Sequence, residues 1–394
     1  MDIDYNPFDY EFQADPYPTY ARMQDEAPVY YSEEFDLFAL TRHADVGAAL
    51  RDSDRLSNSH GPLLERDFWK PDAAKMHSMV AMDPPEHTQF RALVSDSFTP
   101  RKVAALEPRI RQLARRNVEA AVERGKFDFV VDLSKTIPMA TISMVVGVPE
   151  ADQELAQRLL DGTVHREDGA VDISPKEMKA FYDLTEYYVG LVAEKRRVQS
   201  DDLLSSLVSS EVDGRGLTDH EIVAFLHLLG GASTQTTIDL ISNAWYWAWR
   251  NPEQRKVAMA GGIRGWVEET LRYDSAVQMV NRHVNEDIVL HDVTIPQGAQ
   301  LVLLLGAANR DGRVFPEPHK YDVSRDATGV LSFSKGPHTC LGNLLGRLQA
   351  RIVLEELAAR VADYDIDAAQ LKRVHRATVR GFTTMTTEVT PIRS

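Results

Sequence analysis

Apolar residues occupy nearly every face of the stretch 219–250, which predicts a long buried helix. Thr218 and Glu221 have the spacing of a capping box, which marks the start of the helix. No proline follows before Pro252, so the helix would extend over roughly 33 residues, or about 50 Å. Within it, residues 230–237 combine two glycines with a group of hydroxyl side chains. These residues either let the helix bend or open locally, or merely hydrogen-bond one another.

Shorter patterns predict the surrounding elements. Residues 27–31 and 38–42 have the composition of short strands, and a helical segment follows at 45–51. Residues 110–210 form a series of amphipathic helices. Alternation over 287–304 predicts a strand, a turn and a second strand. After residue 340, apolar side chains at helical spacing predict another helix: Leu341, Leu344, Leu345, Leu348, Ile352 and Val353.

The whole pattern predicts a mainly α fold with small β-sheets (α+β). No repeat, low-complexity segment or linker divides the chain, so we expect one domain over residues 1–394. Its β-richer parts should lie near 27–45, 283–305 and 370–394.

Composition excludes several classes of function. The formal net charge of −15 argues against nucleic acid or an anionic membrane as a partner. A hydrophobic content of 43% is enough for a large core. We find no apolar N-terminal signal and no run of eighteen apolar residues, so we expect a cytoplasmic protein without a membrane anchor.

Cys340 is the single cysteine of the chain, which excludes an internal disulfide and a structural zinc site. A buried filler, a nucleophile or a single thiolate ligand to a metal remain possible. Gly336 and Gly342 flank the thiol, and glycine lets a backbone lie close against a bulky group. The helix predicted after Cys340 would place the sulfur near a helix N-terminus, which stabilises a thiolate. These surroundings favour the ligand.

The pattern Phe-x-x-Gly-x-His-x-Cys-x-Gly over residues 333–342 resembles the haem-binding loop of the cytochrome P-450 superfamily. The matching residues are Phe333, Gly336, His338, Cys340 and Gly342. The chain departs from the family at Ser334, where a second glycine is usual, and at Gly346, where alanine is commoner. The resemblance implies a cytochrome P-450 fold with haem b buried between the long central helix and this loop. It also implies that Cys340 supplies the axial thiolate to the iron.

Three further residues match family positions that bind the haem propionates. His87 and Arg91 follow two prolines and are four residues apart, so they project from one helix face. Alone, the pair would indicate only a solvated face. Its context, Asp-Pro-Pro-Glu-His-x-x-x-Arg, resembles the haem-propionate helix. Arg282, ahead of a predicted strand, resembles the other propionate ligand.

The middle of the long helix resembles the oxygen-side motif Ala-Gly-x-acid-Thr-Thr. Alignment from Pro252 places the motif at 232–237 and makes Thr236 the oxygen-side hydroxyl. The rival register uses Thr234, which points about 200° away around the helix. Ser233 replaces the usual glycine, and Gln235 replaces the acid. An amide cannot relay a proton by ionising, so an ordered water chain, Ser233 or a substrate group would have to substitute.

Glu269 and Arg272 match the Glu-x-x-Arg pattern of the family, which supports the haem face structurally. Spaced three residues apart on a helix, they can pair bidentately, although such pairs are common on surfaces. Lys320 would be the third member of the group, in place of the arginine often found in the family.

The resemblance also places a mobile lid near residues 150–190 and a lipophilic substrate pocket beneath it. Residues 56–75 would cover this pocket, or would form only an ordinary surface loop. The candidate substrate contacts are Leu63, Leu64, Phe68, Trp69, Leu229, Ala232, Val277, Met279, Val280, Phe382 and Thr383.

A locally basic segment follows residue 100 and would dock a ferredoxin-type donor, or simply form a solvated helix face. Its candidates are Arg101, Lys102, Arg109, Arg111, Arg115 and Arg116. Electrons would come ultimately from NAD(P)H through a reductase and the ferredoxin.

The leading hypothesis is a monooxygenase that inserts one oxygen atom from O2 into a terpenoid, steroid, polyketide or aromatic. Gln235 favours an alternative, namely oxidative coupling, dehydrogenation or peroxide-driven chemistry. A haem-based sensor or carrier is the third hypothesis, and no output domain supports it.

Overall fold

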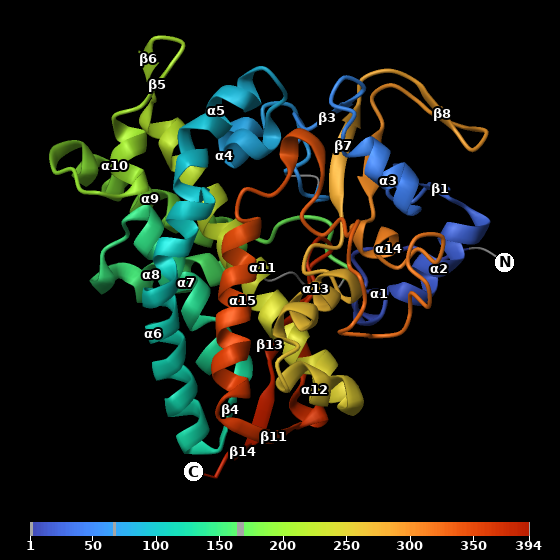
Figure 1. Ribbon diagram of the computed structural model, residues 1–394. Helices are drawn as coiled ribbons and strands as arrows, with labels where there is room; N and C mark the ends of the chain where they lie inside the picture. The colour runs from blue at the N-terminus through green and yellow to red at the C-terminus, as the bar shows by residue number, and fades with distance from the viewer. Residues whose placement is uncertain (1–2, 66–67, 164–168, 394) are drawn as a thin grey trace.

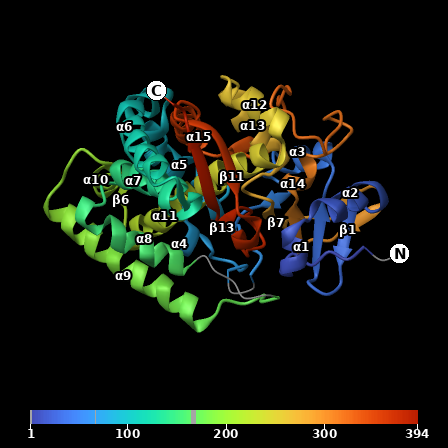
Figure 2. The same cartoon turned by 90° about the horizontal axis from the view of Figure 1, so that it is seen from below.

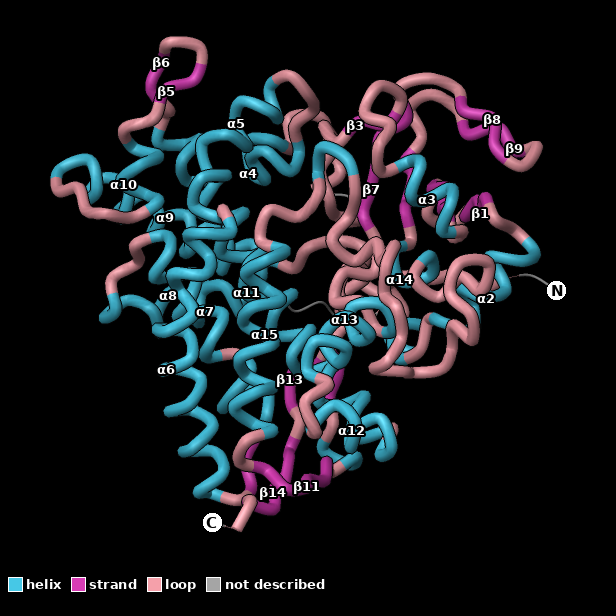
Figure 3. Tube along the Cα trace, in the orientation of Figure 1, coloured by secondary structure: helices cyan, strands magenta, loops and turns pink. Residues whose placement is uncertain are grey.

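The computed structural model describes residues 3–65, 68–163 and 169–393. Helices fill one side of the molecule, and a sheet with the N-terminal helices forms the other (Figure 1). Figure 3 separates the same two regions by colour and shows a further group of strands near the C-terminus. The expected mainly α fold with small β-sheets is confirmed.

Helix α11, Asp219–Arg250, is the long central helix that the sequence predicts. Thr218 caps it through the expected capping box with Glu221. The helix stays α-helical through residues 230–237, where Thr236 and Thr237 donate their hydroxyl protons to the carbonyls of Ala232 and Ser233. Most of its length is buried, because helices pack around it on several sides.

The helices around α11 belong to one large hydrophobic core. In Figure 2, α9 runs along one outer edge of the molecule, and it packs against α11. The principal helices of this group are α5 Glu86–Ser95, α6 Pro100–Arg124, α7 Thr136–Val146, α8 Gln153–Gly162, α9 Pro175–Arg197, α10 Leu203–Val208, α12 Pro252–Met259, α13 Ile263–Tyr273 and α15 Asn343–Ala358.

A five-stranded sheet holds the other side together, in the order β1-β2-β10-β7-β3. Short helices α1 Tyr10–Ala14, α2 Tyr17–Glu26, α3 His43–Ala49 and α14 Leu305–Ala308 accompany it. Its strands are β1 Val29–Ser32, β2 Leu37–Leu40, β3 Leu56–Ser57, β7 Val280–Val284 and β10 Gln300–Leu303.

The predicted strand–turn–strand over 287–304 is confirmed, but the strands on the two sides of the turn at 297–298 do not pair with each other. Strand β9, Val293–Ile295, pairs with β8, Ile288–Leu290, in a small hairpin. Strand β10 does not pair with β9; it lies parallel to β2 and antiparallel to β7. The parallel pairing joins residues more than 250 positions apart, so no local pattern could indicate it.

The C-terminal part of the chain adds two smaller sheets. One has the order β11-β14-β4, from Val361–Ile366, Thr386–Pro391 and Lys126–Asp128. The other pairs β12, Lys372–Arg373, with β13, Phe382–Thr384. The loop between β12 and β13 returns toward α11 and contributes to two of the three cavities described below. Within the described ranges, none of the helices has the length and apolarity to cross a bilayer.

Candidate active site

The segment 333–342 forms a tight loop that presents Cys340 to the interior. The Cys340 amide donates to the Phe333 carbonyl at 2.8 Å and closes the loop. Gly336 has φ +73°, and a Cβ there would lie 2.6 Å from the Leu50 carbonyl oxygen, so only glycine fits. Ser334 adopts φ +60°, a left-handed conformation that glycine would adopt with less strain. Helix α15 begins at Asn343, three residues after the cysteine.

The surroundings of Cys340 disfavour ionisation of its thiol when no metal ion is bound. Burial raises its pKa, although the Gly342 amide and the charges of Arg91 and Arg347 act in the opposite direction. The free group is therefore a neutral thiol at neutral pH, contrary to the thiolate expected from the following helix. A bound metal cation would remove the proton, because a coordinating thiol is deprotonated.

A cavity of about 290 Å³, called here the Cys340 cavity, separates this loop from α11. The loop and the start of α15 form one wall, while α11 forms the opposite wall. Most of the lining is apolar, including Leu229, Val277 and Val280. Ser233, Thr236 and Thr237 are the polar residues of the α11 wall. Thus Cys340 and these hydroxyl groups face one another across an apolar space.

Imidazole and guanidinium groups gather at one side of the Cys340 cavity. His87 and His338 have ring centroids 4.1 Å apart, and Arg91 donates to the Thr339 carbonyl at 2.7 Å. His87 Nδ1 and His338 Nε2 are buried without a hydrogen-bond partner among the described residues. Burial lowers the pKa of Arg282 to about 10, and nearby Asp83 only partly offsets this effect.

These residues fit a haem. A buried thiol could bind the iron, apolar walls suit the macrocycle, and the unpartnered donors suit its carboxylates. Burial and neighbouring cations also lower the pKa of His338 to about 3, so its ring is neutral and can donate from one nitrogen. The sequence-based prediction placed His87, Arg91 and His338 together, and the fold brings them to one cavity.

The polar residues of α11 are divided between the Cys340 cavity and a second one. Thr236 borders both cavities, and its hydroxyl donates to the Ala232 carbonyl at 2.8 Å. Thr234, the residue of the rival register, borders only the second cavity. Gln235 also lines the second cavity. Of the two threonines, Thr236 is therefore the one that faces the Cys340 cavity.

Asp239 lies one helical turn beyond Gln235 and was not identified from the sequence. Gln235 Nε2 donates to Asp239 Oδ1 at 2.8 Å, and Asp239 Oδ2 has no partner among the described residues. Burial raises the pKa of the Asp239 carboxyl to about 8, although the Gln235 hydrogen bond opposes the shift. Gly381 packs on this carboxyl so closely that a Cβ there would lie 2.0 Å from Oδ1. The four-residue spacing from Gln235 was the available signal.

The second cavity, called here the outer cavity, has a volume of about 280 Å³ and is also mainly apolar. It meets the Cys340 cavity at Val80, Leu228, Ala232 and Thr236, which line both. Phe68, Phe181 and Val379 form apolar walls, and the imidazoles of His77 and His227 are polar points in them. Burial lowers the pKa of both histidines to about 4, so both are neutral. The predicted lid region contributes α8 and α9 to this cavity, but residues 164–168 lie outside the described ranges.

Six of the predicted substrate contacts line one of these cavities: Leu63, Phe68, Leu229, Ala232, Val277 and Val280. Leu64 and Met279 do not, because both belong to the core beside the N-terminal segment. Phe382 is buried against Tyr246 and Arg373, and Thr383 is exposed. Trp69 lies beside His60 instead. The residues of the C-terminal segment that reach the outer cavity are Arg376, Thr378 and Val379.

Glu269 and Arg272 form a fully buried, bidentate ion pair on α13, with N–O distances of 2.7 and 2.8 Å. Arg272 also donates to the carbonyls of Asn309 and Pro318 at 3.0 and 2.9 Å. The third member is Arg325, at 3.4 Å from Glu269, and not Lys320. The ammonium of Lys320 instead lies 3.7 Å from Glu317 at the surface.

The basic segment on α6 is partly neutralised. Arg111 and Arg115 form ion pairs with glutamates of α15, and Lys102 pairs with Asp96. Arg101, Arg109 and Arg116 form no ion pair among the described residues. A groove beside α6 and α15 carries further cations, Arg264, Arg347 and Arg351, together with exposed Leu344.

Comparison with known proteins identifies the family. Residues 263–360, which include the buried ion pair and the Cys340 loop, match the family model for cytochrome P450. The Mycobacterium tuberculosis protein named cytochrome P450 123 is 44% identical over 380 residues, 96% of this chain and 94% of that protein. The chain belongs to the cytochrome P450 family. It is therefore a haem-dependent monooxygenase of small molecules.

Two other cytochromes P450 match over nearly the whole chain. The vitamin D(3) 25-hydroxylase of Pseudonocardia autotrophica is 36% identical over 96% of this chain and 95% of its own length. The structure of cytochrome P450 CYP109Q5 from Chondromyces apiculatus superposes with a TM-score of 0.89 at 31% identity, and covers both chains completely. The fold assigned above is thus that of a cytochrome P450.

Proposed function

We propose that this cytochrome P450 hydroxylates, epoxidises or O-dealkylates a lipophilic molecule of the terpenoid, steroid, polyketide or aromatic class. The observation that carries the proposal is the junction of an apolar outer cavity with the Cys340 cavity at Thr236. A substrate in the outer cavity would bring one carbon to the α11 side of the Cys340 cavity. The relative named vitamin D(3) 25-hydroxylase supports a lipophilic substrate.

Cys340 would hold the haem iron, while His87, Arg91, Arg282 and His338 would hold the propionates. When bound, the haem supplies the activation of dioxygen. The residues around it orient the reaction: apolar side chains exclude water, and Thr236 borders the Cys340 cavity with a hydroxyl oxygen that can accept a hydrogen bond while its proton is donated to the Ala232 carbonyl.

A ferredoxin would supply the electrons at the face near α6 and α15. Arg101, Arg109 and Arg116 on α6 are available for an acidic partner, and the nearby groove adds Arg264. The electrons would originate from NAD(P)H through a reductase.

Titration of the haem-loaded protein with steroids, terpenoids, polyketides and methoxylated aromatics tests the substrate class. A spin-state shift in the absorption spectrum with one class would identify it, followed by product analysis. Phe181→Asp should weaken that binding by at least about 10-fold, since a charge would enter an apolar cavity. Absence of a shift with every class would contradict a free lipophilic substrate.

Thr236→Ala should divert electrons from product to hydrogen peroxide, because the variant removes the hydroxyl facing the Cys340 cavity. We expect a several-fold rise in peroxide per electron consumed, with little change in substrate affinity. Thr234→Ala is the matched control because Thr234 borders only the outer cavity. A larger effect from Thr234→Ala would reverse this assignment.

We further propose that Asp239 supplies the acid that Gln235 lacks. At neutral pH the Asp239 carboxyl retains its proton. Gln235 orients this carboxyl, because its Nε2 donates a hydrogen bond to Oδ1. On proton delivery, the O–H bond of Asp239 breaks and solvent water later restores the proton. The charged or titratable groups that influence it are Asp274, Arg373 and Arg376.

Asp239→Asn should lower product formed per electron and remove a pH dependence. In the wild type, the ratio should fall as the pH rises through about 8, because the carboxyl then loses its proton. The double variant Gln235→Glu with Asp239→Asn exchanges acid and amide within the same hydrogen-bonded pair. It should restore the amount of product formed per electron. Failure of this exchange, with wild-type substrate binding intact, would assign Asp239 to structure alone.

Oxidative coupling, dehydrogenation or peroxide-driven chemistry is the second candidate, favoured by the amide at Gln235. Product formation with hydrogen peroxide in place of the electron donors tests it. A rate that matches or exceeds the donor-driven rate would support peroxide-driven chemistry, and a product that contains no added oxygen atom would support coupling or dehydrogenation over oxygen insertion.

A further inference from the structure

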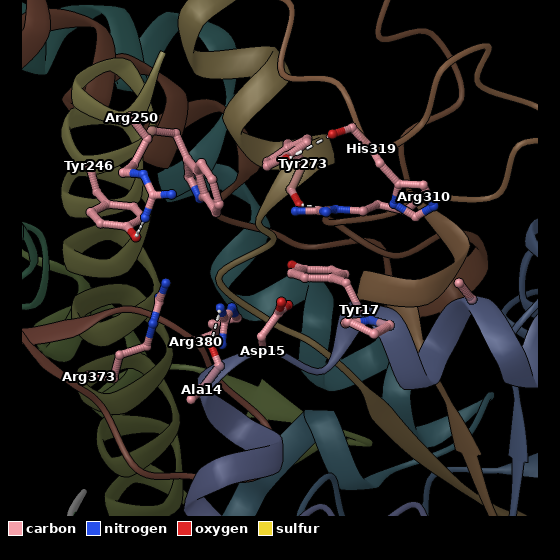
Figure 4. Close-up of a pocket in the computed structure, with 13 residues that line it drawn as sticks. Ala14, Asp15, Tyr17, Tyr246, Arg250, Tyr273, Arg310, His319, Arg373 and Arg380 are labelled. Carbon is pink, nitrogen blue, oxygen red and sulfur yellow. Dashed lines mark hydrogen bonds between the residues drawn. The ribbon is translucent and has the colours of Figure 1, made fainter. Parts of the chain in front are cut away.

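A second type of cavity lies away from the Cys340 loop, where α2, the C-terminal end of α11 and the C-terminal segment meet. Figure 4 shows this cavity, called here the arginine cavity, which has a volume of about 530 Å³. Arg250, Arg310, Arg373 and Arg380 converge on it from three parts of the chain, because Arg373 and Arg380 belong to one C-terminal segment. Neither the haem nor the substrate proposed above uses it.

The cavity has more guanidinium groups than carboxylates to neutralise them. Four guanidinium groups line the cavity, whereas the nearby carboxylates are Asp15 at its exposed rim and buried Asp274 beneath it. Arg380 forms an ion pair with Asp274, with Nε at 2.7 Å from Oδ1. Tyr17 and Trp247 also donate to the Asp274 carboxylate, at 2.7 and 2.8 Å. Little of its hydrogen-bonding capacity is left for the other arginines.

Two buried guanidinium nitrogens of the arginines that line this cavity lack a hydrogen-bond partner among the described residues. They are Nη2 of Arg310 and Nη1 of Arg373. Arg310 is 94% buried, since only 6% of its surface is exposed. Arg373 Nη1 lies 3.8 Å from Asp274, beyond hydrogen-bond distance. A buried donor without an acceptor is costly, so each position favours an incoming acceptor.

The electrostatics of Arg373 indicate the charge of that acceptor. Burial and the charge of Arg380 together lower the pKa of Arg373 to about 10, and Asp274 only partly offsets this effect. The group remains cationic at neutral pH but lacks sufficient anionic compensation. An anion between Arg373 and Arg310 would supply it.

Aromatic rings hold the Arg310 guanidinium in place. It lies between the rings of Tyr17 and Tyr273, at 3.5 Å from each centroid, and its Nε donates to the Tyr273 carbonyl at 2.7 Å. Figure 4 shows this guanidinium extended between the two tyrosines. A planar cation fixed in this way presents its remaining donors in a set direction, which suits an oxyanion.

We propose that the arginine cavity binds an oxyanion, namely the phosphate or carboxylate group of a small molecule. Arg310 and Arg373 supply the unpartnered donors, and Arg250 closes the rim. Arg250 donates to the Tyr246 hydroxyl at 3.1 Å, and the residue is otherwise exposed.

The position of the cavity connects it to the substrate side. Arg373 and Arg380 stand at the two ends of one segment whose middle residues, Arg376, Thr378 and Val379, line the outer cavity. Arg380 already fixes one end of the segment through Asp274, and an oxyanion held by Arg373 would restrain the other end. Binding should therefore slow amide hydrogen exchange over residues 374–381.

Calorimetric titration of the haem-loaded protein with inorganic phosphate, and separately with succinate, tests the proposal. We expect saturable binding of at least one probe. Its affinity should fall at least about 10-fold in Arg310→Gln and in Arg373→Gln. Arg250→Gln, at the exposed rim, preserves the buried contacts and should weaken binding about threefold. Arg264→Gln is the control, since it removes an exposed arginine outside this cavity.

Three results would overturn the proposal. The first is that neither probe binds at millimolar concentration. The second is that the Arg264→Gln control weakens binding as much as Arg250→Gln does. The third is binding without slower exchange over 374–381, which would place the anion elsewhere. Preference for phosphate over succinate, or the reverse, identifies which oxyanion the cavity takes.

Discussion

Cys340→Ser is expected to abolish the haem–thiolate absorption spectrum and to reduce monooxygenase activity below detection. Cys340 provides the one sulfur ligand that the cysteine content of the chain allows. A serine hydroxyl retains its proton and cannot replace the electron donation of a thiolate to the iron. The absorption spectrum of the reduced, carbon monoxide-bound protein measures the loss directly.

Thr339→Ala is the matched control for this variant. Thr339 lies beside the cysteine, and its hydroxyl donates only to the Gly336 carbonyl at 2.8 Å. The backbone carbonyl that accepts from Arg91 remains in the variant. We expect Thr339→Ala to keep the thiolate spectrum. An unchanged spectrum in Cys340→Ser would remove the basis of the proposed site.

Arg272→Ala is expected to destabilise the protein by about 3–5 kcal/mol, because it leaves the buried Glu269 carboxylate without its bidentate partner. It also leaves the carbonyls of Asn309 and Pro318 without their donor. Urea unfolding followed by circular dichroism measures the change. Arg272→Lys should recover only part of the loss, since an ammonium cannot reproduce the paired geometry.

The control for this prediction is Lys320→Ala. Its ammonium is exposed and lies 3.7 Å from Glu317, so we expect a change within about 0.5 kcal/mol. A loss from Lys320→Ala as large as that from Arg272→Ala would contradict the assignment of Arg325 as the third member of the buried group.

Local patterns predicted the elements whose structure depends on neighbouring residues. The capping box at Thr218 and the absence of proline before Pro252 gave α11 nearly to the residue. The ion pair of Glu269 and Arg272 could also be predicted, because the two residues are three positions apart on one helix. The loop around Cys340 was also local, whereas the role of Cys340 as a metal ligand came from the resemblance to the cytochrome P-450 superfamily and stays a prediction.

Contacts between segments that are distant in the chain could not be predicted from the sequence to the same extent. The turn after Pro318 brings Arg325 to Glu269, and nothing in the sequence favours it over Lys320. Phe382 and Val379 are three residues apart, yet one packs on Tyr246 and the other lines the outer cavity. Asp239 became a candidate only once its burial and its bond to Gln235 were known.

The central claim is that the Cys340 sulfur coordinates the haem iron. X-ray absorption at the iron edge of the haem-loaded wild-type protein tests it most directly. The account predicts one sulfur in the first coordination shell of the iron, together with the four porphyrin nitrogens, and its loss in Cys340→Ser. A first shell that contains only nitrogen and oxygen in the wild type would contradict the claim.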